Sequence, residues 1–265
     1  MPSTRSGKRS RDDPDAGSAQ RKCKSKESKE DMGQLQRHFM NGFKVQQPSD
    51  HARHAVFRCV YQWAKGEGRK LDSALYPGSY IDIVPSLTIR RVVYVDNFTG
   101  NKGHVQEFFA PDNRDELVRT LLGQRAYEGA PQIGYYNQDF TNKDALSEEK
   151  HNQFDALISF SAGGNISRTC HKFVRQGGLL IVNDDFGDAS SAMGPRSPWK
   201  LLAGFDGSRL ETAKLDAFFK LKKTKQSATR EQCAQNVGFA YSKRPFKFTQ
   251  NALAYVFEKV DPEGQ

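Results

Sequence analysis

Three carboxylates stand close together in the segment Asn183-Asp184-Asp185-Phe186-Gly187-Asp188, directly after an apolar run. Carboxylates at this spacing could bind Mg²⁺ or act as a general base. A polar loop at the end of a strand is the competing interpretation, because aspartate also begins turns. The segment therefore makes Asp184 and Asp185 candidate catalytic residues, while the sequence predicts no metal site.

Small or acidic residues close apolar runs at several other places in the chain. Parallel strands joined by crossovers bring their carboxyl ends to one edge of a sheet, where open α/β proteins bind their ligands. The repeated pattern therefore predicts that the residues after each run share one site. The residues that follow the runs are Pro77, Gly78 and Ser79, then Asp96, then Asp139, and then Ser159, Ala162 and Gly163.

The elements that position these residues follow from apolar patterning. A helix is expected to begin at Ser49 or Asp50 and to end near Gly66, because Val56, Val60 and Ala64 recur at helical spacing. The last third of the chain is expected to add two more strands and a helix. The predicted strands cover 73–76, 92–95, 133–136, 154–160, 179–182, 199–205 and 253–259, and further helices are predicted at 115–122, 166–174 and 211–220.

The amino-terminal segment differs in composition from the rest of the chain. Residues 1–30 contain no Leu, Ile, Val, Phe, Tyr or Trp, and they hold nine Lys or Arg against five Asp or Glu. Such a segment cannot bury enough apolar surface to offset the entropy lost on ordering, so it is predicted to be disordered. We therefore divide the chain into a basic tail, residues 1–45, and one domain, residues 46–262.

Two basic clusters in this tail, Lys8–Arg11 and Arg21–Lys26, resemble a bipartite nuclear-import signal. Importin or nucleic acid is the partner expected for them, and a solvated tail with no role is the alternative. The chain has neither an apolar amino-terminal signal segment nor an apolar run of membrane-spanning length. The expectation is thus a cytoplasmic or nuclear protein that is not secreted and does not contact a membrane.

The motifs around the first strands and the Gly-Gly pair resemble a known family. Leu75 to Ser86, Val93-Tyr94-Val95-Asp96, Phe154 to Ser159 and Ala252 to Phe257 are similar to bacterial methyltransferase-like proteins of unassigned activity. The step Gln176-Gly177-Gly178-Leu179-Leu180 resembles the helix–Gly–Gly–strand step of class I S-adenosylmethionine-dependent methyltransferases. The resemblance covers about residues 50–260. It implies a Rossmann-like α/β fold, with a seven-stranded, mostly parallel sheet flanked by helices.

The resemblance also implies a role for each residue of the predicted site. Gly78 would pass close to the methionine part of S-adenosylmethionine, with Pro77 and Ser79 beside it. Asp96 would accept hydrogen bonds from the ribose hydroxyls, and Asp139 would lie near the adenine amino group. The stretch from Ser159 through Ala162 to Gly163 would line the floor, and Asp82 is a further candidate to face the cleft. Typical class I enzymes have a Gly-x-Gly-type loop after the first strand. This loop departs from that pattern, since Tyr76-Pro77-Gly78-Ser79-Tyr80 has one glycine.

The leading hypothesis is therefore an S-adenosylmethionine-binding, methyltransferase-like enzyme whose methyl acceptor is unknown. The alternative is a non-catalytic Rossmann-like protein that binds nucleic acid or a partner protein through basic surfaces. Residues Lys220 to Lys225 could track a phosphate backbone, although no aromatic residue lies among them, which favours a solvated loop. A nicotinamide-dependent oxidoreductase is disfavoured, because no Gly-x-Gly-x-x-Gly follows a strand.

Overall fold

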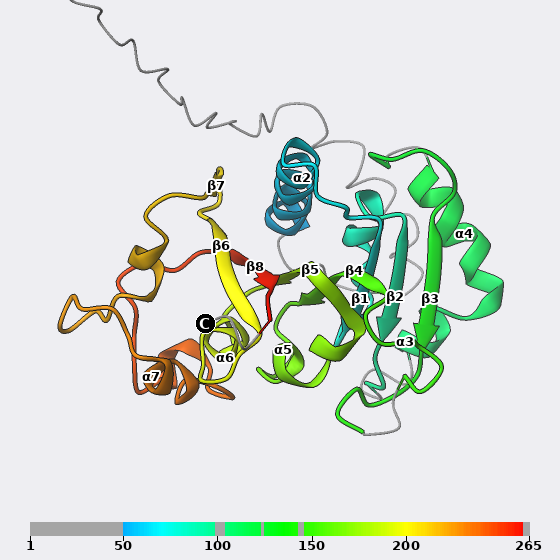
Figure 1. Ribbon diagram of the computed structural model, residues 1–265. Helices are drawn as coiled ribbons and strands as arrows, with labels where there is room; N and C mark the ends of the chain where they lie inside the picture. Colours follow the sequence, from blue (N-terminus) through cyan, green and yellow to red (C-terminus); the bar gives the residue numbers. More distant parts are fainter. Residues whose placement is uncertain (1–49, 99–103, 123–124, 143–145, 262–265) are drawn as a thin grey trace, which may run out of the picture.

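The computed structural model describes residues 50–98, 104–122, 125–142 and 146–261. The predicted basic tail lies outside the described residues. Within these ranges the chain forms a single mixed sheet with helices on both faces (Figure 1).

The described part of the chain forms a sheet of eight strands in the order β3-β2-β1-β4-β5-β8-β6-β7. The first five strands run parallel to one another, and β8 lies antiparallel between β5 and β6. The order 3-2-1-4-5 is that of a Rossmann-like sheet, so the predicted fold class is confirmed. An eighth strand, the two-residue β7, extends the predicted seven. The strands are β1 (Ser73–Pro77), β2 (Arg91–Val95), β3 (Gln132–Tyr136), β4 (Phe154–Ser159), β5 (Val174–Val182), β6 (Trp199–Phe205), β7 (Leu210–Glu211) and β8 (Ala254–Lys259).

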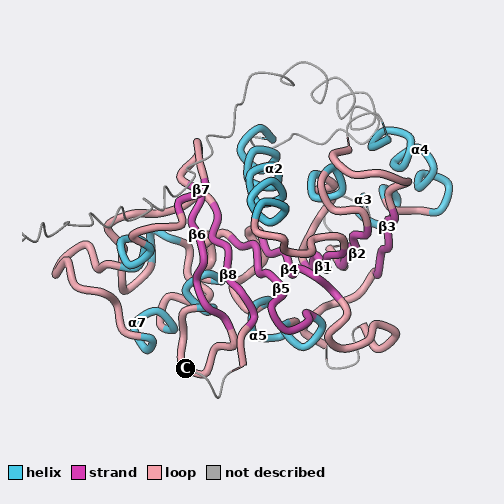
Figure 2. The backbone as a smooth tube through the Cα atoms, turned by 45° about the horizontal axis from the view of Figure 1, so that its top comes forward, coloured by secondary structure: helices cyan, strands magenta, loops and turns pink. Residues whose placement is uncertain are grey.

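Helices cover the two faces of this sheet. Figure 2 shows α2, α3 and α4 on one side and α5 and α7 on the other. The longest helix, α2, confirms the prediction made from Val56, Val60 and Ala64, which are all buried. The helices are α2 (Asp50–Gly66), α3 (His104–Phe108), α4 (Pro111–Leu122), α5 (Ile166–Thr169), α6 (Asp188–Ala192) and α7 (Arg230–Ala234), and the 3₁₀ turns are η1 (Val84–Leu87), η3 (His171–Phe173), η4 (Leu215–Phe219) and η5 (Tyr241–Lys243).

Strand residues alternate between two hydrophobic clusters, as a period of two requires. In β1, Ala74 and Tyr76 pack with the side chains of α2, whereas Leu75 packs on the opposite face with Ile166 of α5. Both faces of the central strands are therefore buried. This explains why these strands read in the sequence as nearly continuous apolar runs.

The structure corrects two of the predicted elements. The Gly177-Gly178 pair does not end a helix: α5 and η3 finish earlier, and β5 already begins at Val174. A Cβ on Gly178 would come within 3.0 Å of the Asp155 carbonyl oxygen, where the register between β4 and β5 shifts. The glycine pair thus serves a bulge in β5, which brings two backbones close together.

The second correction concerns the helix predicted at 211–220. Glu211 instead lies in β7, where it pairs with Gly204 of β6, and only the short turn η4 follows. Phe218 packs directly over Gly204, where a Cβ would approach its ring to 2.5 Å. Pairing with β6 and this ring contact override the helical spacing of the apolar residues.

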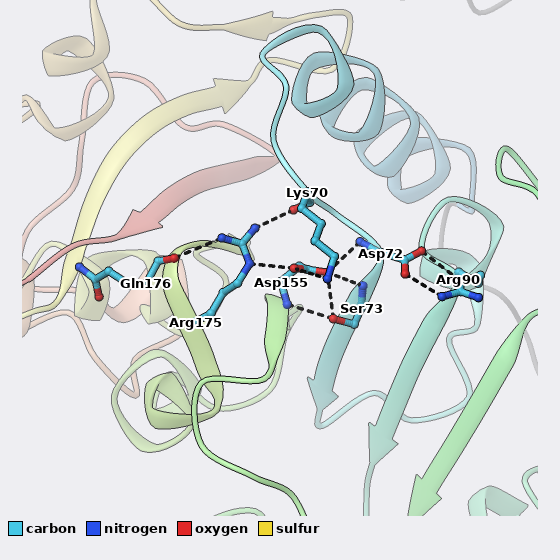
Figure 3. Close-up of polar contacts among 7 residues, drawn as sticks. All are labelled: Lys70, Asp72, Ser73, Arg90, Asp155, Arg175 and Gln176. Atoms are coloured by element: carbon cyan, nitrogen blue, oxygen red, sulfur yellow. Dashed lines mark hydrogen bonds and ion pairs between the residues drawn. The ribbon is translucent and has the colours of Figure 1, made fainter.

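The amino ends of the central strands are joined through the buried carboxylate of Asp155 (Figure 3). Its Oδ2 accepts hydrogen bonds from the backbone amides of Asp72 and Ser73, both at 3.0 Å, and from the Ser73 hydroxyl at 3.0 Å. Its Oδ1 accepts a hydrogen bond from Arg175 Nε at 2.8 Å. One residue therefore ties together the amino ends of β1, β4 and β5.

Candidate functional site

The loop after β1 and the loop after β4 are in direct contact at the carboxyl edge of the sheet. Gly78 has a positive φ of 63°, and a Cβ placed on it would overlap with the methyl group of Ala162. Only glycine combines this backbone conformation with so close an approach. Two segments of the predicted site, around Gly78 and around Ala162, are thus brought together.

Asp96 directly follows β2, beside the same loop, and is half-buried. Its Oδ2 accepts a hydrogen bond from the Tyr80 amide, and its Oδ1 accepts one from the Phe98 amide, both at 2.7 Å. The Tyr135 hydroxyl of β3 donates to the Asp96 carbonyl oxygen at 2.8 Å. Asp96 therefore holds the carboxyl ends of β1, β2 and β3 in one arrangement.

Exposed aromatic surface lies next to this carboxylate. Phe98 is 52% exposed and meets the ring of Tyr80 edge to face, with 5.7 Å between the centroids. Tyr80 itself has a positive φ of 49°, which is unusual for a residue with a side chain. Pro77 and Ser79, in the same loop as Tyr80, are buried.

Asp139 lies after β3 and is exposed. Its Oδ1 accepts hydrogen bonds from the Thr141 hydroxyl at 2.7 Å and from the Thr141 amide at 2.8 Å. These bonds hold the pKa of the Asp139 carboxyl below its ordinary value. The local turn thus accounts for the position of Asp139, and its contact with an adenine group stays a prediction.

Ser159 ends β4 and is buried, together with Asp188 at the start of α6. Asp188 Oδ1 accepts hydrogen bonds from the Ser167 hydroxyl and amide, at 2.7 and 3.1 Å. Burial raises the pKa of the Asp188 carboxyl. By contrast Gly163, four residues beyond Ser159, is exposed with open space at its Cβ position.

A cavity of about 410 Å³ opens at this edge, beyond the carboxyl ends of β4 and β5. Its walls come from α2, from the loops after β4 and β5, and from the segments around Tyr241 and Leu253. The cavity is therefore built from parts that lie far apart in the chain. The lining residues are Arg53, Val56, Phe160, Ser161, Asn183, Asp184, Asp185, Tyr241, Asn251, Ala252 and Leu253.

A hydrogen-bonded triad forms the polar wall of this cavity. Asp185 Oδ2 accepts hydrogen bonds from the Ser161 hydroxyl and from Asn183 Nδ2, both at 2.6 Å. The Ser161 amide donates to Asn183 Oδ1 at 3.0 Å. Asp185 itself is exposed, so its carboxylate is fixed in place and still accessible to a ligand.

The other two candidate catalytic aspartates have structural partners. Asp184 is buried, and its Oδ2 pairs with Arg244 Nη1 at 2.5 Å. Asp82 Oδ2 pairs with Arg53 Nη1 at 2.9 Å and accepts the Tyr76 hydroxyl at 3.0 Å. Burial, strengthened by the Asp82 charge, raises the pKa of Tyr76 well above its ordinary value, so this hydroxyl stays a donor.

Sequence reasoning missed the other polar walls of the cavity. Arg53 comes from α2, and its guanidinium lies 5.7 Å from the centroid of the Phe160 ring. Tyr241 comes from a turn late in the chain that carries no motif. The positive φ of Ser161, 59°, is a backbone property that the amino-acid type does not signal.

The described residues hold no group of three or more His, Cys, Asp or Glu that could bind a metal ion. Over the same residues, no helix combines the length and the apolar character that crossing a membrane requires.

Solved structures align with this chain at low sequence identity. No protein-family model and no curated protein matches the chain. A solved structure from Corynebacterium glutamicum aligns with 10% identity and a TM-score of 0.41, covering 89% of this chain and 92% of the other. A methyltransferase from Geobacter sulfurreducens aligns with 13% identity and a TM-score of 0.37, covering 67% and 82%.

A third match is a phosphoethanolamine N-methyltransferase from Haemonchus contortus in complex with phosphoethanolamine and S-adenosylhomocysteine. It aligns with 11% identity and a TM-score of 0.31, covering 61% of this chain and 34% of the other. Because the three TM-scores are below 0.5, the assignment of the Rossmann-like fold rests on the strand order itself.

Proposed function

We propose that this chain is an S-adenosylmethionine-binding, methyltransferase-like protein whose cofactor lies against Asp96 and the Gly78 loop. The observation that carries the proposal is the Asp96 carboxylate, which is accessible at the carboxyl edge and is fixed by the Tyr80 and Phe98 amides. In open α/β sheets this edge is the ligand-binding edge.

The residues present suit this cofactor. Each Asp96 oxygen accepts one amide hydrogen bond, and a carboxylate has about four acceptor positions, so acceptors remain for ribose hydroxyls. The exposed ring of Phe98 offers a face on which an adenine can pack. The open space at Gly163 gives room along the same edge. When bound, the cofactor would supply an activated methyl group.

The cavity beside this edge is the proposed place for the methyl acceptor. Asp185 would orient the acceptor and receive a proton from it, because Ser161 and Asn183 hold its carboxylate toward the opening. An Asp185→Asn variant keeps the shape of the side chain and removes its charge. We expect it to bind cofactor normally and to lose methyl transfer once an acceptor is known.

Calorimetric titration of the full chain with S-adenosylmethionine and S-adenosylhomocysteine tests the cofactor site, with NAD as the comparison ligand. Asp96→Ala removes the charged acceptor, and hydrogen bonds to charged groups contribute about 1.5–3 kcal/mol each, so we expect affinity to fall roughly 10- to 100-fold. Glu128→Ala is the matched control, since Glu128 is exposed in the loop before β3, at the opposite edge of the sheet.

Two results would overturn the proposal. One is a wild-type chain that binds neither sulfur compound more tightly than NAD. The other is an Asp96→Ala variant that unfolds at the same urea concentration as wild type and binds the cofactor with unchanged affinity.

We also propose that the two basic clusters at Lys8–Arg11 and Arg21–Lys26 direct nuclear import. A fluorescent fusion of the full chain should concentrate in nuclei. Replacing the lysines and arginines of both clusters by alanine should distribute it between nucleus and cytoplasm. An unchanged nuclear signal in that variant would refute the assignment.

A further inference from the structure

Outside the basic tail, the net positive charge of the chain lies in one folded segment. Residues 214–250 contain nine Lys or Arg and only two Asp or Glu, which gives this segment +7 of the formal +9 of the whole chain. Figure 1 shows α7 and its flanking loops, in orange, beside α6 and far from β3. The charge is therefore localised at one end of the molecule.

Backbone pairing brings lysines from two parts of this segment together. The Lys222 amide donates to the Lys247 carbonyl oxygen at 2.7 Å, and Leu221 pairs with Phe248 in an antiparallel bridge. Lys222, Lys223, Lys243 and Lys247 are all exposed. No ion pair is formed by these four lysines with any residue that the structure describes.

The lysine run contains no aromatic residue, but the segment with exposed aromatic rings is bonded to the one that carries Lys247. Asn236 Nδ2 donates to the Phe246 carbonyl oxygen at 2.9 Å, and Arg244 Nε donates to the Phe239 carbonyl oxygen at 3.3 Å. Phe239 is 47% exposed and Tyr241 is 36% exposed, and Tyr241 also lines the cavity. Phe186 is 38% exposed, and its carbonyl oxygen accepts a hydrogen bond from the Gly238 amide at 2.8 Å. Phe186 and Phe239 thus belong to two loops that this backbone hydrogen bond holds together, and Tyr241 follows Phe239 in the second loop.

We propose that these residues form a binding surface for single-stranded nucleic acid. We call it the basic-aromatic surface, and it consists of Lys222, Lys223, Lys243, Lys247, Phe186, Phe239 and Tyr241. Lysines at a surface neutralise phosphates, and exposed rings stack on unpaired bases, which a duplex does not offer. Exposed lysines combined with exposed rings suit a ligand that carries both phosphates and unpaired bases, and competition with an acidic polypeptide tests the other partner.

Fluorescence anisotropy of the full chain with labelled 20-nucleotide RNA and DNA of mixed sequence tests the proposal. Each phosphate contact on a single strand contributes about 0.7 to the slope of log K against log salt. We therefore expect Lys222→Ala/Lys223→Ala/Lys247→Ala, which removes three such contacts, to reduce the magnitude of this slope by about 2. The matched control is Lys65→Ala/Lys150→Ala/Lys200→Ala, three exposed lysines near the amino ends of strands. The basic tail is present in every variant, so its contribution cancels in the comparison.

The aromatic residues give a second, independent readout. Phe239→Ala/Tyr241→Ala should weaken binding of single strands roughly 10- to 100-fold, since stacking contributes about 1–3 kcal/mol per base. The same variant should bind a duplex of equal length as wild type does. Circular dichroism of each variant checks that the fold is retained.

Binding of either RNA or DNA with these losses supports the proposal. Equal binding by the two lysine variants overturns it, and so does an aromatic variant that binds single strands as wild type does. Competition by polyglutamate as effective as that by unlabelled RNA also overturns it, in favour of an acidic protein partner. The cofactor titration is independent of all these outcomes, so failure of one proposal leaves the other intact.

Discussion

Replacing Gly78 by alanine tests whether the loop after β1 is packed against the loop after β4. Two costs add in this variant. The φ of 63° is left-handed, which costs an L-residue roughly 1–2 kcal/mol. The new methyl group would overlap with the Ala162 methyl, with the Ala162 Cα at 3.5 Å and Ile166 Cδ1 at 3.7 Å, and overpacking costs about 1–3 kcal/mol. We therefore expect a loss of about 2–5 kcal/mol.

Urea unfolding followed by circular dichroism measures this loss. Gly66→Ala is the control, because Gly66 ends α2 with open space at its Cβ position, and alanine there should be neutral or slightly stabilising. A second variant, Gly78→Ala/Ala162→Gly, removes the overlap and retains the backbone cost. It should show a favourable coupling energy of about 1–3 kcal/mol in a double-mutant cycle.

Two outcomes would refute this reasoning. A Gly78→Ala variant as stable as the Gly66→Ala control would mean that neither the backbone conformation nor the contact is as described. A loss without any coupling to Ala162→Gly would show that the two loops are not in contact, and the proposed cofactor edge would lose one of its walls.

Three further predictions concern buried carboxylates. Asp184→Ala leaves the Arg244 side chain, which has no exposed surface, without its counter-ion, so we expect about 3–5 kcal/mol lower stability by urea unfolding; a loss below 1 kcal/mol would contradict the ion pair. Asp155→Asn should cost about 3 kcal/mol at neutral pH. Burial opposes ionisation of Asp155, yet hydrogen bonds from Arg175 and from the Asp72 amide lower the pKa of the Asp155 carboxyl. The stabilisation by the ionised carboxylate is therefore present above about pH 4 and is lost as pH falls through the folded-state pKa. The loss of stability in Asp155→Asn should therefore become smaller in acid, and a loss that does not change with pH would show that Asp155 is not ionised in the folded protein. Burial raises the pKa of the Asp188 carboxyl, so the native protein loses stability as pH rises above the ordinary value of that pKa. Asp188→Asn should therefore gain melting temperature relative to wild type as pH rises from about 4, and parallel curves would show that Asp188 does not titrate.

The sheet could be predicted from the sequence because its strands are buried on both faces. Each of the runs at 73–76, 92–95 and 154–160 is nearly continuous in apolar residues, and each is a strand in the structure. Two local patterns misled. The Gly177-Gly178 pair is a bulge in β5, and the segment 211–220 pairs with β6, since tertiary contacts at Asp155 and Phe218 outweigh helical spacing.

The candidate site was predicted in part. Asp96 and the Gly78 loop lie together at the carboxyl edge, as expected for residues that follow parallel strands. Of the candidate aspartates, Asp185 faces the cavity with an accessible carboxylate, whereas Asp184 faces a buried arginine. Neighbouring residues after a strand point in different directions, and the sequence does not say which one meets solvent.

By itself, the sequence determined the strands and the polar residues at their carboxyl ends, because burial and turn chemistry act on neighbours in the chain. Only the tertiary structure decided what completes the cavity and the basic-aromatic surface. Arg53 reaches the cavity from α2, and Tyr241 joins it from a turn between α7 and β8. Lys222 meets Lys247 through a backbone hydrogen bond. Such groups are separated by long stretches of chain, so only the packing of the whole domain can bring them together.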